Sequence, residues 1–113
     1  MVVKEFNVLW TQTAIEDLDD IINYIANDSI ESSKKIFYQI KKKSENLKTF
    51  PNRGRIIPEL KYHNIETYRE IIIDPWRLFY RIEKNNVYVL SIIDGRRNIE
   101  DILMTKFLSK KFV

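Results

Sequence analysis

The residues best suited to bind a ligand are arginines interleaved with aromatic side chains along the second half of the chain. The set comprises Arg53, Arg55, Arg69, Arg77, Arg81, Arg96 and Arg97, with Tyr68, Trp76 and Tyr80 among them. A guanidinium makes two-point contacts with phosphate or carboxylate groups, and aromatic rings stack on unpaired bases. The set therefore suits RNA or an acidic peptide. The plain alternative is that each arginine pairs with a neighbouring carboxylate at the surface.

Arg77 and Arg81 are the arginines whose positions constrain them most. A strand expected over residues 76–83 puts both on one face and puts Trp76 and Tyr80 on the other, because side chains alternate along a strand. If helices cover the arginine face, the two guanidiniums need partners there. If that face is open, they form a positive plate for a ligand.

Composition excludes several classes of active site. The chain has 113 residues, no cysteine and a single histidine, His63. Thiolate metal sites and cysteine nucleophiles are therefore excluded, and a Ser-His-Asp triad is disfavoured. The carboxylates lack the spacing of metal ligands, so we expect neither a metal nor another cofactor.

The length and the 44% apolar content predict one globular domain over residues 1–113. No apolar run is long enough to span a membrane and no signal segment is recognisable, so we expect a cytoplasmic protein without a membrane partner. Charge is strongly polarised: residues 11–31 carry six acids and no bases, whereas residues 34–55 carry eight bases and one acid. Such a distribution is typical either of a surface for a polyanion or acidic protein, or of solvated helix faces.

The N-terminal half predicts a strand and a helical hairpin. Residues 5–10 are β-compatible, and Thr13 with Glu16 fits a capping box at the start of a first helix. A second helix should begin near Ile30 behind a cap formed by Asp28 and Glu31. The apolar stripes that these helices should bury contain Ala14, Leu18, Ile21, Ile22 and Ile25, and then Ile36, Phe37, Ile40 and Leu47.

The C-terminal half predicts a loop, a meander and a short helix. Residues 50–64 contain two of the three prolines and form the loop. The runs 65–73, 76–83 and 87–93 are separated by short connections, which favour antiparallel hairpins. Apolar positions from residue 99 to 107 predict the final helix. The expected fold class is therefore α+β, with an N-terminal strand, an α-helical hairpin packed on a twisted, mainly antiparallel four-stranded sheet, and a short C-terminal helix.

Several stretches of the sequence together carry a family resemblance. They are FPxxGRxxPEL at residues 50–60, YRE at 68–70, WRLFYRI at 76–82 and IDGRR at 93–97. With the order of elements, they resemble the RelE/ParE superfamily of toxins from type II toxin–antitoxin systems, over roughly residues 5–98. The resemblance implies a toxin that is neutralised by a cognate antitoxin and that contacts operator DNA only through it. An exposed surface rich in basic residues, together with an apolar C-terminal helix over residues 99–112, would form a groove that suits an acidic amphipathic segment of the antitoxin.

The resemblance leaves two activities open, because fold does not fix function. RelE-like members cleave messenger RNA on the ribosome, whereas ParE-like members bind and poison DNA gyrase. Cleavage next to a 2′-hydroxyl needs a general base, and residues 94–113 contain no His and no Tyr that could serve. Catalytic candidates for a nuclease are Arg55, Arg69, Arg77, Arg81, Arg96, Arg97, Glu59 and His63, with Lys61 and Glu70 as further substitutes for the base.

The ParE-like interpretation is favoured because it asks only for a binding surface with aromatic and arginine anchors. The helical hairpin expected over residues 12–49 is also longer than is usual in RelE-like chains. The expected target-binding residues are Arg53, Arg55, Arg69, Trp76, Arg77, Tyr80, Arg81, Arg96 and Arg97. A ribosome-dependent endoribonuclease is the alternative, and a non-toxic, antitoxin-bound co-repressor is the third hypothesis.

Overall fold

A computed structural model of the protein describes residues 4–108. The elements, in chain order, are β1 (Asn7–Trp10), α1 (Gln12–Ala26), α2 (Ile30–Glu45), the 3₁₀ turns η1 (Asn46–Lys48) and η2 (Pro51–Arg53), β2 (Arg55–Ile56), α3 (Pro58–Lys61), β3 (Tyr68–Ile73), β4 (Trp76–Glu83), β5 (Asn86–Asp94) and α4 (Ile99–Leu108). No helix of this part of the chain is long and apolar enough to cross a membrane.

The strands form one sheet in the order β1-β5-β4-β3-β2. β1 pairs with β5 in parallel, and every other pairing is antiparallel. The α+β class, the hairpin and the meander are thus confirmed. The sheet has five strands instead of the expected four because Arg55 and Ile56 pair with Glu70 and Arg69. Two residues next to a glycine and prolines carry no strand pattern, so this pairing was not visible in the sequence.

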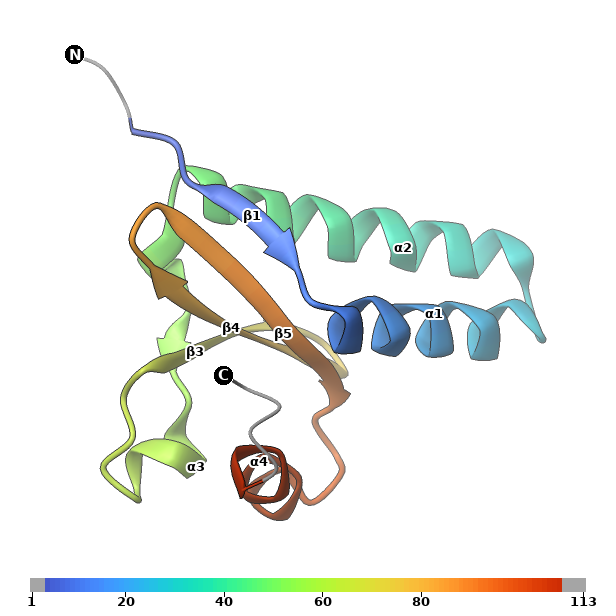
Figure 1. Cartoon of the computed structure of the whole chain (residues 1–113). Helices are drawn as coiled ribbons and strands as arrows, with labels where there is room; N and C mark the ends of the chain where they lie inside the picture. The colour runs from blue at the N-terminus through green and yellow to red at the C-terminus, as the bar shows by residue number, and fades with distance from the viewer. Residues whose placement is uncertain (1–3, 109–113) are drawn as a thin grey trace.

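The sheet is covered on both faces. The α1–α2 hairpin packs on one face through a cluster that includes Leu18, Ile40, Leu78 and Tyr80. The small helices α3 and α4 lie together away from the hairpin, as Figure 1 shows, and pack on the other face around Phe79. The expected alternation along β4 is therefore confirmed. The face that bears Arg77 and Arg81 is a covered face.

β5 contains a β-bulge, at which its pairing with β4 shifts by one residue. Phe79 pairs with Ser91 and Tyr80 pairs with Val89, so Leu90 is the extra residue. Asp17 of α1 accepts hydrogen bonds there from the Ser91 hydroxyl (2.5 Å) and the Ile92 amide (3.0 Å). Asp17 thereby attaches α1 to β5, because Ile92 lies beyond the last β1–β5 pair, Trp10 and Val89, and its amide needs an acceptor from α1.

The predicted helix caps were wrong by one or two residues. Thr11, not Thr13, caps α1: its side chain accepts from the Ala14 amide. The Thr11 amide also bonds Val89, so the helix begins directly where the β1–β5 pairing ends. Ser29, not Asp28, caps α2, since the Asp28 amide still belongs to the last turn of α1 and bonds the Ile25 carbonyl.

Two further details of the helices differ from the sequence analysis. Phe37 is 37% exposed, so it is not a core residue of α2, and Leu47 is buried from η1. α4 ends at Leu108 in the described chain, and the last residues of the helix expected over 99–112 lie outside the described residues.

We expect Thr11→Ala to lower the free energy of unfolding by about 1 kcal/mol, because it removes both the helix cap and the hydroxyl that donates to the Val89 carbonyl (2.9 Å). Thr11→Ser keeps the hydroxyl and should recover most of this loss. Urea denaturation of the three proteins measures the difference. Equal losses in both variants would contradict the role given to the hydroxyl.

Candidate functional site

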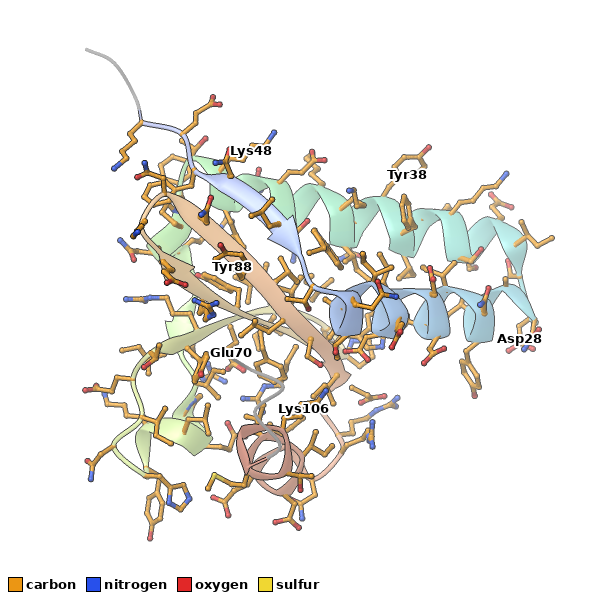
Figure 2. The ribbon with its side chains drawn as sticks, viewed as in Figure 1. Asp28, Tyr38, Lys48, Glu70, Tyr88 and Lys106 are labelled. Atoms are coloured by element: carbon orange, nitrogen blue, oxygen red, sulfur yellow. The ribbon has the colours of Figure 1, made fainter. Side chains whose placement is uncertain are left out.

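Glu70 of β3 is a buried carboxylate held between two arginines. Its side chain is fully buried, and Figure 2 shows it beside β3. Nε of Arg55 and Nε of Arg77 each donate to one of its oxygens at 2.6 Å. A buried charge is tolerated when such donors satisfy it. β2, β3 and β4 are thereby joined by one carboxylate.

Arg77 uses its remaining nitrogens on α3. Nη1 and Nη2 donate to the two oxygens of Glu59, both at 2.7 Å. These hydrogen bonds lower the pKa of Glu59 and raise that of Arg77. The side chain of Arg77 is only 11% exposed. The covered-face alternative of the sequence analysis therefore holds for Arg77, which lies between two carboxylates.

Arg81 is held on the same covered face. It pairs with Glu83, and its guanidinium carbon lies 4.5 Å from the ring centre of Tyr88. Its Nε is buried and has no hydrogen-bond partner within residues 4–108. Arg77 and Arg81 do not form an open positive plate, because Glu59 and Glu70 engage Arg77 while Glu83 and the Tyr88 ring engage Arg81.

Tyr80 and Arg69 fix the loop before β2. The Tyr80 side chain is fully buried, and its hydroxyl accepts from the Gly54 amide (2.9 Å) and donates to the Pro51 carbonyl (2.7 Å). Burial raises the pKa of this hydroxyl. Arg69 donates to the Gly54 carbonyl at 2.7 Å. A Cβ on Gly54 would lie 2.6 Å from the Tyr80 hydroxyl and 2.4 Å from the Glu70 carbonyl, so only glycine fits.

The remaining predicted residues divide between two exposed surfaces. The first is a groove of about 520 Å³ between α1 and the C-terminal end of β5, here called the α1–β5 groove. Its lining includes Trp76, Arg96, Arg97 and the 75% exposed Tyr24. Arg96 donates two hydrogen bonds to the Asp94 carboxylate, from Nε (2.9 Å) and from Nη2 (2.6 Å). These hydrogen bonds lower the pKa of Asp94 to about 2. The Arg97 side chain makes no hydrogen bond or ion pair within the described chain.

The second is a basic surface at the end of the hairpin that lies next to the sheet. It is defined by Lys42, Lys43, Lys48, Arg53 and Arg55. Arg53 lines all three of the hollows found there, and Figure 2 shows Lys48 at the outer side of this end.

His63 lies apart from both surfaces, at the contact between α3 and α4. Its Nε2 is 3.7 Å from a carboxylate oxygen of Glu100, and its ring meets Tyr62 edge-on. Lys61 is exposed at the end of α3. Among residues 4–108, no three His, Asp or Glu side chains gather closely enough to hold a metal ion.

Sequence reasoning missed part of both surfaces. Tyr24 and the half-buried Ile25 line the groove, and the exposed Phe50 lies beside Arg53. Tyr24 lies off the apolar stripe of α1, which is a signal that a large aromatic residue is exposed. Phe50 carried no such signal, because an aromatic residue at the end of a helix normally packs into the core.

The chain was compared with known proteins. Residues 8–99 match the family model of the ParE toxin of the type II toxin–antitoxin system parDE. The chain belongs to this family. The toxin is 27% identical to Toxin ParE3 of Caulobacter vibrioides over 93 residues, which are 81% of this chain and 89% of that protein.

Solved structures have the same fold as the toxin. A chain of the chromosomal ParDE toxin–antitoxin system from P. aeruginosa gives a TM-score of 0.67 at 21% identity, over 80% of this chain and 97% of that one. A chain of the RelBE2 toxin–antitoxin complex from Mycobacterium tuberculosis gives 0.53 at 20% identity, over 82% and 94%. The protein is thus a type II toxin of the RelE/ParE superfamily, as the sequence motifs predicted.

We expect Glu70→Gln to lower the free energy of unfolding by about 1.5–3 kcal/mol, because a neutral amide replaces the buried carboxylate that accepts from Arg55 and Arg77, while Glu59 still pairs with Arg77. Glu59→Gln is the matched control, since the Glu59 side chain is 27% exposed. It should cost about 1 kcal/mol. Urea denaturation distinguishes the two, and equal costs would refute the central place of Glu70.

The stability of the toxin should fall in acid through Glu59. The pKa of this carboxyl is lower in the folded chain than its ordinary value of 4.5, chiefly because Arg77 donates to it. Its contribution is therefore complete above pH 4.5 and is lost as the pH falls through the folded pKa. The free energy of unfolding, measured from pH 7 to pH 3, should decline less steeply in Glu59→Gln. Identical slopes would contradict this assignment.

Proposed function

We propose that the toxin acts by binding, as an inhibitor of DNA gyrase, and not as a nuclease. The observation that carries this proposal is that the carboxylates placed among the arginines are already occupied. Both oxygens of Glu59 accept from Arg77, and Glu70 is buried between Arg55 and Arg77. A general base must be able to accept a proton from the attacking hydroxyl. These carboxylates would first have to give up their arginine partners.

The α1–β5 groove is the surface proposed to hold the target. Tyrosine, tryptophan and arginine are the side chains that dominate binding energies at protein interfaces, and the groove presents one or more of each. Tyr24 and Arg97 are exposed and Arg97 is without an ion pair in the described residues, so both are available to a partner. Arg96 is less available because Asp94 already engages it.

A cognate antitoxin is the proposed second partner. The family description and the two structural relatives name toxin–antitoxin systems, and this supports neutralisation of the free, growth-inhibiting toxin by a protein encoded with it. Contact with operator DNA is proposed to occur only through that antitoxin.

Gyrase supercoiling assays with purified toxin test the proposal. Wild-type toxin should inhibit supercoiling, and Tyr24→Ala combined with Arg97→Ala should raise the half-inhibitory concentration by about 30-fold, as expected for two interface anchors of at least about 1 kcal/mol each. Tyr38→Ala combined with Lys34→Ala is the matched control. The control also removes one aromatic and one cationic side chain, in this case from exposed positions of α2. It should inhibit supercoiling as strongly as wild type.

A parallel assay on programmed ribosomes gives the outcomes that would overturn the proposal. Cleavage of messenger RNA with unimpaired gyrase would assign the toxin to the ribosome-dependent endoribonucleases. Inactivity in both assays would favour the antitoxin-bound co-repressor.

A further inference from the structure

The basic surface defined above gathers cations from four consecutive elements. Lys42 and Lys43 belong to the last turn of α2, Lys48 to η1, Arg53 to η2 and Arg55 to β2. The three hollows between them have volumes of about 320, 500 and 360 Å³. Arg53 lines all three, so the hollows adjoin one another at this side chain, and together they are called the path.

Most of these cations are free to bind an anion. Lys42, Lys48 and Arg53 make no side-chain hydrogen bond or ion pair within residues 4–108, and the Arg55 side chain remains 60% exposed although its Nε donates to Glu70. The only other carboxylate in the lining is Glu45. The path is therefore strongly positive, and its charge is not neutralised internally.

An exposed aromatic ring lies on the same path. Phe50 is 62% exposed and lines two of the three hollows together with Arg53. Because this phenyl ring is largely exposed to water, it adds little hydrophobic stabilisation to the fold. It does offer a flat face on which a base can stack while its phosphates meet the cations.

The segment that carries these groups is held rigidly. The Tyr80 hydroxyl bonds the chain at Pro51 and at Gly54, on either side of Arg53, and Arg69 holds the Gly54 carbonyl. A preorganised loop loses little conformational entropy when it binds, so its contacts contribute more fully to affinity.

We propose that this surface binds single-stranded nucleic acid, with Phe50 stacked on a base and with Lys42, Lys48 and Arg53 in contact with the backbone phosphates. Positive charge alone would suit an acidic protein equally well. The exposed ring between cations favours a strand in which π faces and phosphates alternate. The inference does not depend on the gyrase proposal, because the α1–β5 groove supplies none of these residues.

Fluorescence anisotropy of labelled twelve-nucleotide strands with the purified full-length toxin tests this inference. Oligo-dT and oligo-U form the two arms, and the tighter arm identifies DNA or RNA as the source. Lys42→Gln combined with Arg53→Gln should weaken binding about tenfold and reduce the slope of log K against log salt by about 1.4, which corresponds to two phosphate contacts. Lys34→Gln combined with Lys35→Gln, on the first turns of α2, removes the same charge and should change neither value.

Stacking is tested by conservative changes of Phe50. Phe50→Leu keeps an apolar side chain but lacks a π face, and should weaken binding about 5- to 150-fold at an unchanged salt slope, whereas Phe50→Trp should bind at least as tightly as wild type. Thermal unfolding checks that each variant is folded. Equal affinities for wild type and Phe50→Leu would overturn the proposal. So would polyglutamate of equal charge binding as tightly as the oligonucleotides, since that result would assign the surface to an acidic protein.

Discussion

The buried carboxylate of Glu70 is the interaction on which the arrangement of this sheet depends. An ionised carboxylate in the interior needs donors, and here Arg55 and Arg77 supply them from the strands on either side of β3. Arg77 in turn draws Glu59 and the short helix α3 onto the sheet. The two-residue strand β2, which apolar contacts alone would hold weakly, is thereby connected to the centre of the sheet.

This network also divides the arginines by role. Arg77, Arg81 and Arg69 are engaged by acids, an aromatic ring and a backbone carbonyl, so they organise the fold around the sheet. Arg53 lines the basic surface and Arg97 lines the α1–β5 groove, and neither makes an ion pair within residues 4–108, so both are available to partners. A chain with a modest net charge of +3 can therefore present one cationic surface and one groove of mixed charge, because its acids neutralise some arginines and leave others free.

The two surfaces differ in what they offer. The α1–β5 groove combines apolar side chains of α1 with Trp76, both signs of charge and one free arginine, as protein interfaces do. The basic surface also has apolar side chains in its lining, Phe50, Ile71 and Ile72, but its charge is almost entirely of one sign. For these reasons the groove is the proposed protein-binding surface and the basic surface is the proposed surface for a polyanion.

The sequence by itself determined the α+β class, the hairpin and the meander, because hydrophobic periodicity and turn residues act over short distances. It also determined the family, because several motifs have the residue types and spacing typical of that family. It also determined which residue types could bind a target. The tertiary structure decided which of them are free. Arg77 and Arg97 look alike in the sequence, but one meets Glu59 and Glu70 across the sheet and the other meets solvent. The cap at Thr11 and the strand β2 were likewise decided by hydrogen bonds to residues far along the chain, which no local pattern encodes.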